Sequence, residues 1–126
     1  MMEKQFLHQV FQQLQNDVPE IDGLSVVTSD GKVIDAQWSN NIEIDKVGAV
    51  GSALLGLGKK AIEILSRGGL LQVVLQSTEG MLSVYSAGSH SVLIIHMSNA
   101  GNLGMLNLYA RKAAATIAET LKDEDL

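Results

Sequence analysis

The stretch LLQVVLQSTEGMLSVYSAGSHSVLIIHMS, residues 70–98, decides the fold of this chain of 126 residues. It predicts three strands, over 70–77, 81–87 and 91–98, because each segment is rich in aliphatic and β-branched residues and is bounded by turn residues. The turns between them are short, and short turns join antiparallel neighbours. The centre of the chain is therefore predicted to form an antiparallel sheet.

Both faces of these strands are apolar. In the last of them Val92 and Ile94 alternate with Leu93 and Ile95. A sheet that is apolar on both faces must be covered on both. The sequence therefore predicts an α/β fold of three layers, a sandwich in which helices lie on both sides of an antiparallel sheet.

Helices are predicted on either side of this stretch. Apolar residues at helical spacing indicate helices over about 3–16, 45–66 and 103–121. Asp45 is the expected N-cap of the middle helix, and Arg67-Gly68-Gly69 its expected end.

A hairpin precedes the middle helix. Its strands, over 24–28 and 32–36, flank Ser29-Asp30-Gly31, and an Asp-Gly pair favours a tight turn. The element order is therefore α-β-β-α-β-β-β-α. We expect one domain over 1–126, with 122–126 as a frayed acidic tail.

The middle helix carries two apolar faces. The face expected to lie on the sheet consists of Val47, Val50, Leu54, Leu57, Ala61, Ile64 and Leu65. A neighbouring face consists of Gly48, Gly51, Ser52, Leu55, Lys59 and Ile62. Small residues on that second face allow another backbone to approach closely, which favours packing against a second copy of the chain. The alternative is a contact with another part of the same chain.

The strand that follows this helix adds to the predicted dimer interface. Few charged or proline residues protect the segment 70–76, so at a sheet edge it could pair with its own copy in an isologous contact. The predicted interface therefore comprises Gly48, Gly51, Ser52, Leu55, Lys59, Ile62, Leu71, Val73 and Leu75.

Composition excludes several classes of function. The net charge is −5 and the basic residues are scattered, which argues against binding nucleic acid. There is no cysteine for a disulfide, thiol catalysis or a cysteine zinc site. The apolar runs are shorter than the about 20 residues that span a bilayer, and the N-terminal residues lack the apolar stretch of a signal peptide. We expect a cytoplasmic protein without direct membrane insertion.

Motifs for chemistry are weak. The run 56–61 fits G-x-G-x-x-A, but it falls inside the middle helix, whereas a dinucleotide fingerprint joins a strand to the start of a helix. His8, His90 and His96 fall on a helix, a turn and a strand, without the spacing of metal ligands. We expect no catalytic, cofactor-binding or metal site. Trp38, the sole tryptophan, is interpreted as a packing residue or as an exposed anchor for a partner.

Several of these segments together resemble one family. Ile21-Asp22-Gly23-Leu24 followed by Ser29-Asp30-Gly31 is similar to the opening hairpin of the Roadblock / dynein light chain family. The glycine- and alanine-rich helix over 47–65 and the loop Asn102-Leu103-Gly104-Met105-Leu106, followed by Ala110-Arg111-Lys112-Ala113-Ala114, also match its pattern.

The resemblance implies more than the residues show. It implies a five-stranded antiparallel sheet in the order 2-1-5-4-3, with the first and last helices on one face and the middle helix on the other. It implies a homodimer formed through the middle helix and the third strand. Stand-alone prokaryotic members resemble the MglB-type regulators, which bind a Ras-like small GTPase as dimers and can promote hydrolysis of its nucleotide.

The expected function is therefore a non-catalytic homodimeric module that binds and regulates or scaffolds a Ras-like GTPase. Two alternatives remain open at this point. One is a small-ligand-sensing module with its ligand between sheet and helix, and the other is a purely structural assembly adaptor. The sequence assigns no surface to the GTPase.

Overall fold

The computed structural model describes residues 2–39, 41–98 and 101–124, with side chains for 4–39, 41–98 and 101–121. The elements follow the predicted order. They are α1 (Met2–Asp17), β1 (Ile21–Thr28), β2 (Val33–Trp38), α2 (Ile44–Leu65), β3 (Val73–Ser77), β4 (Gly80–Ser86), β5 (Ser91–Met97) and α3 (Leu103–Glu124).

The strands form one antiparallel five-stranded sheet in the order β2-β1-β5-β4-β3. This confirms the order that the resemblance implied. The first strand lies inside the sheet, because it pairs with β2 on one side and with the central strand β5 on the other, where Leu24 lies opposite Ile95. Strands from the two halves of the chain are thereby joined in one sheet.

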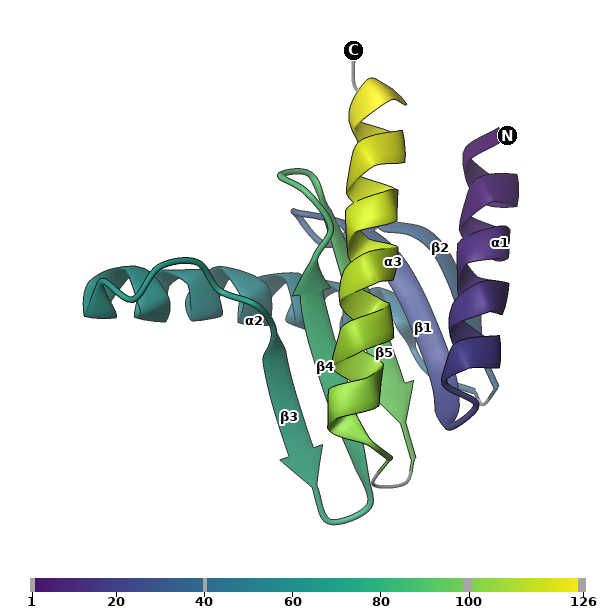
Figure 1. The fold of residues 1–126 in the computed structure, drawn as a ribbon, viewed down its shortest axis with the longest axis horizontal. Helices are drawn as coiled ribbons and strands as arrows, with labels where there is room; N and C mark the ends of the chain where they lie inside the picture. The colour runs from purple at the N-terminus through teal and green to yellow at the C-terminus, as the bar shows by residue number, and fades with distance from the viewer. Residues whose placement is uncertain (1, 40, 99–100, 125–126) are drawn as a thin grey trace.

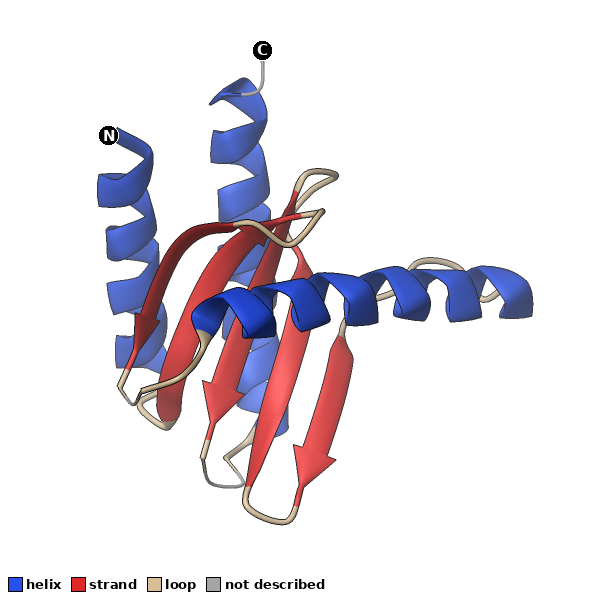
Figure 2. Cartoon of the chain, turned by 180° about the vertical axis from the view of Figure 1, so that it is seen from behind, coloured by secondary structure: helices blue, strands red, loops and turns tan. Residues whose placement is uncertain are grey.

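The helices cover the two faces unequally. Helices α1 and α3 lie side by side along one face, whereas α2 crosses the other face at a steep angle to the strands (Figures 1 and 2). The C-terminal part of α2 continues past β3, beyond the edge of the sheet (Figure 2). The predicted three-layer sandwich is confirmed. The layer formed by α2 extends beyond the β3 edge of the sheet (Figure 2).

Two clusters of buried side chains follow from this arrangement. The α1/α3 side holds the larger cluster, which includes Leu7, Phe11, Tyr85 and Ile117. The α2 side holds a small one, which consists of Val27, Leu55, Val84, Val92 and Ile94. Most of the apolar core of this chain therefore lies under α1 and α3.

Helix α2 starts and ends differently from the prediction. Its N-cap is Glu43, whose carbonyl oxygen accepts from the backbone N–H of Lys46 and Val47, so Asp45 lies in the first turn. Its C-cap is Ser66, which adopts a left-handed conformation with φ of 54°. The helix was predicted to end at Arg67-Gly68-Gly69 with a glycine in the left-handed conformation. In the structure Ser66 adopts that conformation instead, before the glycines.

Two other boundaries shift. Strand β3 begins at Val73 because the residues after α2 return from the overhanging helix end to the sheet edge before pairing can start (Figure 2). Helix α3 continues to Glu124, past the expected end at Leu121. Part of the expected frayed tail is therefore helical, and residues 125–126 lie outside the described residues.

Candidate interaction surface

The glycine-rich face of α2 lies directly on the sheet. A Cβ atom at Gly51 would lie 2.3 Å from Cδ1 of Ile94, and one at Gly48 would lie 3.1 Å from Cγ1 of Val27. Leu55, on the same face, is buried in the small cluster. The absence of side chains at Gly48 and Gly51 thus lets the helix approach β1 and β5 closely.

This contact corrects the sequence interpretation of α2. Of the residues expected to face the sheet, four are largely exposed, namely Val50 (53%), Leu57 (68%), Ile64 (74%) and Leu65 (62%). The two faces have largely exchanged roles, although Val47 of the expected face still packs against the small cluster. The helical period does not distinguish the two faces, because apolar residues recur at the same spacing on both. Only the glycine face lets the helix axis come this close to the sheet, because Gly48 and Gly51 have no side chains that would collide with it.

Exposed aliphatic residues also lie at the edge of the sheet, in and just before β3. Strand β3 pairs only with β4 among the described strands, so its outer edge is open. Leu71 is 63% and Leu75 45% exposed. We call these six residues the α2–β3 surface: Val50, Leu57, Ile64, Leu65, Leu71 and Leu75.

The residues predicted for the dimer interface divide between the two regions. Gly48, Gly51 and Leu55 pack within the chain, and the hydroxyl of Ser52 donates to the carbonyl oxygen of Thr28 at 3.0 Å. For these four the alternative, a contact inside the same chain, holds in the structure. The other five lie outside the glycine face or are at least partly exposed: Lys59, Ile62, Leu71, Val73 and Leu75.

Charge is distributed unevenly along α2. Exposed acidic groups lie at its N-terminal end, where Glu43 pairs with Lys46 at 2.8 Å and Asp45 follows. The exposed charged groups toward its C-terminal end are Lys59, Lys60, Arg67 and the acidic Glu63, so that end is net basic. Two copies of this helix laid antiparallel would therefore place a net acidic end beside a net basic one.

Trp38 forms one wall of a pocket beside α2. Its indole lies over Gly23, where a Cβ atom would be 2.2 Å from the ring, and it stacks on the imidazole of His96 with centroids 5.6 Å apart. The pocket has a volume of about 300 Å³ and is lined by Trp38, Ile42, Lys46, Val47, Val50, Leu82 and His96. Trp38 is half-buried, as the packing interpretation requires, yet it borders open space.

Asp22 joins three strands at this end of the sheet. Its carboxylate accepts a hydrogen bond from the backbone N–H of Ser98, and its carbonyl oxygen accepts from the N–H and the hydroxyl of Ser39. The hydrogen bonding from Ser98 lowers the pKa of Asp22 below its usual value. The strand ends that carry Trp38 and His96 are thereby held in place.

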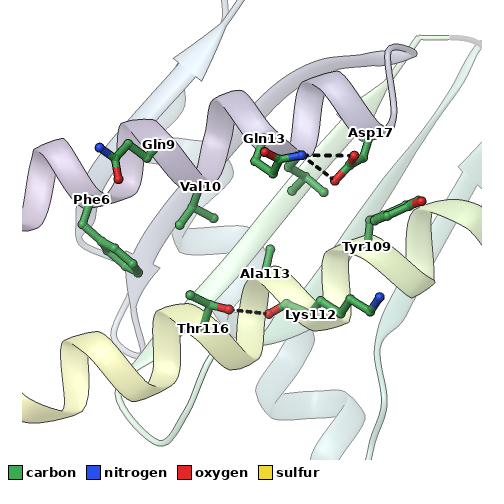
Figure 3. Close-up of a pocket in the computed structure, with 10 residues that line it drawn as sticks. Phe6, Gln9, Val10, Gln13, Asp17, Tyr109, Lys112, Ala113 and Thr116 are labelled. Carbon is green, nitrogen blue, oxygen red and sulfur yellow. Dashed lines mark hydrogen bonds between the residues drawn. The ribbon is translucent and has the colours of Figure 1, made fainter.

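A second apolar groove separates α1 from α3 on the opposite side of the sheet (Figure 3). Phe6 and Val10 face Tyr109 and Ala113 across it, in a volume of about 400 Å³. Glutamines and an aspartate line the α1 side, where the side-chain amide of Gln13 donates to the carboxylate of Asp17. Sequence reasoning did not predict this groove, because both of its walls have the ordinary pattern of core-facing helices.

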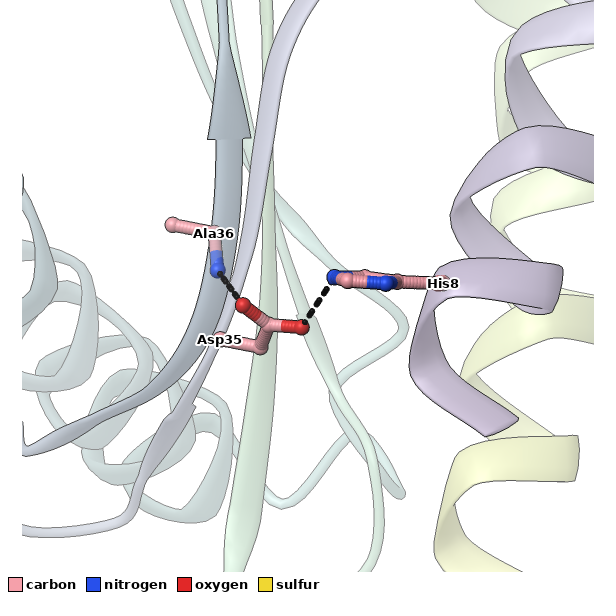
Figure 4. A network of polar contacts seen from close by, with 3 residues as sticks. All are labelled: His8, Asp35 and Ala36. Carbon is pink, nitrogen blue, oxygen red and sulfur yellow. Dashed lines mark hydrogen bonds and ion pairs between the residues drawn. The ribbon is translucent and has the colours of Figure 1, made fainter. Parts of the chain in front are cut away.

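His8 makes a contact between α1 and β2. Nε2 of His8 on α1 lies 2.9 Å from Oδ2 of Asp35 on β2, and Oδ1 of Asp35 accepts from the backbone N–H of Ala36 (Figure 4). This contact ties α1 to the sheet. In the described part of the chain, no three His, Cys, Asp or Glu residues gather as a metal site. The G-x-G-x-x-A run lies inside α2, as predicted.

None of the helices, in the part of the chain with described placement, combines the length and the apolar character needed to cross a membrane.

Comparisons with known proteins agree with this architecture. The Roadblock/LC7 domain family matches residues 7–96. An uncharacterised protein of Methanocaldococcus jannaschii is 28% identical over 102 residues, which are 81% of this chain and 86% of that protein.

Among solved structures, a chain of MglB from a tetrameric arrangement superposes with a TM-score of 0.87 at 15% identity, over 96% of this chain and 91% of the other. The gliding protein MglB of Thermus thermophilus superposes with a TM-score of 0.81, also at 15% identity, over 91% of this chain and 87% of the other. The fold is therefore shared with MglB.

Proposed function

Because the chain belongs to the Roadblock/LC7 domain family, we propose that it is a non-catalytic, homodimeric module that binds a small Ras-like GTPase and regulates or scaffolds it. The observation that carries the proposal is the α2–β3 surface, which combines exposed aliphatic side chains of α2 with those beside an open strand edge. Large contiguous apolar patches on soluble proteins usually mark interaction sites.

We expect a second copy of the chain to occupy this surface. An open strand edge pairs most simply with an identical edge, through a two-fold axis. The same axis lays the two α2 helices antiparallel, with their acidic and basic ends opposed. Burial of the aliphatic side chains then contributes about 25 cal/mol per Å².

The GTPase part of the proposal rests on the family resemblance. The resemblance implies a regulator that acts on the nucleotide site of the GTPase itself, without inserting an arginine. Arg111 donates to Oε1 of Gln72 within the chain, and Arg67 lies exposed just after α2. We assign neither of them as a finger for the active site of the GTPase.

The test is the solution mass by light scattering, alone and with the Ras-like GTPase encoded nearest in the source genome. We expect a dimer that gains mass with the GTPase bound to a GTP analogue and gains less with GDP. Ile64→Asp should reduce self-association, whereas Leu108→Asp, an equally apolar position on α3 with 52% exposure, should not. A solution mass that does not change when the GTPase is added, in either nucleotide state, would reject the GTPase proposal. Masses well above a dimer would favour the assembly adaptor.

A further inference from the structure

The groove between α1 and α3 is an elongated site on the face of the sheet opposite α2. We call it the α1–α3 groove; its walls include Phe6, Val10, Tyr109 and Ala113 (Figure 3). On α1 its lining extends from Phe6 to Asp17, which is about 16 Å at about 1.5 Å per residue. The volume of about 400 Å³ is therefore spread along the helices, which suits an extended chain segment better than a compact molecule.

Aromatic rings lie toward the two ends of this groove. Phe6 comes from α1 and Tyr109 from α3, and Figure 3 shows them at opposite ends of the site. Both side chains are partly buried against the larger cluster and partly exposed. Grooves lined by aromatic side chains are used to bind proline-rich segments in the polyproline II conformation.

The rim of the groove supplies hydrogen-bond donors. Gln9 and Gln13 line it from α1, and both are exposed. The side-chain amide of each glutamine carries two N–H groups. A polyproline II segment has carbonyl oxygens without internal hydrogen bonds, whereas the carbonyl oxygens inside an α-helix are already paired. Donors on the rim therefore favour a proline-rich segment over an amphipathic helix.

One end of the groove is acidic. Asp17 lies in the last turn of α1, which contains no basic residue, and the C-terminal end of a helix carries partial negative charge. Lys112, the basic residue that lines the groove, holds its ammonium group over the ring of Tyr109, 5.8 Å from the ring centroid. A basic residue of a bound segment would complement the carboxylate of Asp17 at this end.

We propose that the α1–α3 groove binds a proline-rich segment of a partner protein in the polyproline II conformation, with an arginine or lysine of that segment beside Asp17. Five residues at about 3.1 Å each span about 16 Å, which is the length of the groove. The groove and the α2–β3 surface lie on opposite faces of the sheet (Figures 1 and 2). The proposal therefore depends neither on the homodimer nor on the GTPase.

The first test is the binding of fluorescent oligoproline peptides to the full chain, followed by anisotropy. One peptide carries an arginine at its N-terminal end and another at its C-terminal end. We expect saturable binding of at least one of them. Replacement of alternate prolines by glycine should weaken binding several-fold, because the flexible peptide loses more conformational entropy when it is ordered. Equal binding of the proline and glycine peptides would overturn the proposal.

Matched variants of α1 test the two polar features. Gln9→Ala should weaken binding, whereas Gln12→Ala, an exposed glutamine that does not line the groove, should not. Asp17→Lys should weaken binding of the arginine peptide by about twofold or more and strengthen binding of a peptide with glutamate in place of arginine. This variant should remain folded, because a cation in the last turn of a helix is favourable. Charge reversal without effect on either peptide would overturn the pairing with Asp17.

Amide chemical shifts locate the bound peptide. We expect the oligoproline peptide to shift the amides of residues 6–17 and 109–116, and to leave those of α2 unchanged. Shifts confined to α2, or no binding of either arginine peptide up to about 1 mM, would overturn the proposal. An amphipathic helical peptide or a small apolar compound that shifts the groove amides, where the proline peptides do not, would assign the groove to that occupant and reject the proposal.

Discussion

The two faces of the central sheet are covered in different ways. On one face α1 and α3 run along the strands and bury a large aliphatic cluster completely, with Phe11 and Tyr85 at 0% and 1% exposure. On the other, α2 crosses the strands, buries a few residues and leaves Leu57 and Ile64 exposed. The first face is covered within one chain, by α1 and α3. The second leaves these aliphatic side chains exposed.

The largest expected effect on stability concerns the face under α1 and α3. Phe11→Ala should lower the free energy of unfolding by about 3–5 kcal/mol, because it opens a cavity in the larger cluster. Urea denaturation followed by circular dichroism measures the change. A loss below about 1 kcal/mol would mean that α1 does not close this core as the structure indicates.

A matched pair on α2 compares its two sides directly. Leu55→Ala, at 4% exposure, should cost about 2–5 kcal/mol of unfolding free energy, whereas Leu57→Ala, at 68%, should change it by less than about 0.5 kcal/mol. The measurement is made where light scattering shows a monomer. At higher concentration Leu57→Ala should weaken self-association. Equal losses for the two variants in the monomer would contradict the exchange of faces.

The glycine contact predicts a smaller effect. Gly51→Val should destabilise the fold by about 1–3 kcal/mol, because the new side chain meets Ile94 and the helix must move away from the sheet. The control is Gly56→Ala, where an added Cβ atom meets nothing within 4 Å and improved helix propensity should stabilise by up to about 1 kcal/mol. Thermal unfolding of both variants gives the comparison.

Tyr85 makes the face under α1 and α3 sensitive to alkaline pH. Burial raises its pKa to about 12, and its hydroxyl donates to Oδ1 of Asn107 at 2.7 Å. The unfolded chain loses this proton near pH 10, earlier than the folded chain does. The stability is therefore complete below about pH 10 and falls by about 1.4 kcal/mol per unit as the pH rises toward 12.

The measurement for Tyr85 is the free energy of unfolding across the alkaline range, from below the unfolded pKa of 10.0 to about 12, in the wild type and in Tyr85→Phe. The wild type should lose stability more steeply, since phenylalanine has no proton to release. Parallel curves would show that Tyr85 ionises as readily in the folded chain as in the unfolded one.

Much of the fold could be predicted from local sequence. The alternation of Val92 to Ile95 indicated a sheet covered on both sides, and the Asp30-Gly31 pair indicated the first hairpin, in which Gly31 has φ of 94°. These patterns depend on neighbours in the chain. The start of β3 was placed too early, because the path back from an overhanging helix depends on where that helix ends in space.

The candidate site was predicted only in outline. The sequence directed attention to α2 and β3, and both carry the exposed aliphatic residues. It assigned the wrong side of α2 to the sheet, because Gly51 and Val50 fit the same period and only the distance to Ile94 separates them. The Trp38 pocket was not predicted at all, since it joins residues from strands far apart in the chain.

The sequence by itself determined the element order, the two-sided apolar sheet, the family pattern and the absence of cysteine, because these follow from composition and from short-range periodicity. Tertiary structure alone decided which face of α2 is buried, how far that helix passes the sheet edge, and that Trp38 lies over Gly23 to reach His96. The reason is steric. The pattern of a helix shows that a face can pack, but only the surface opposite it selects the face that packs most closely.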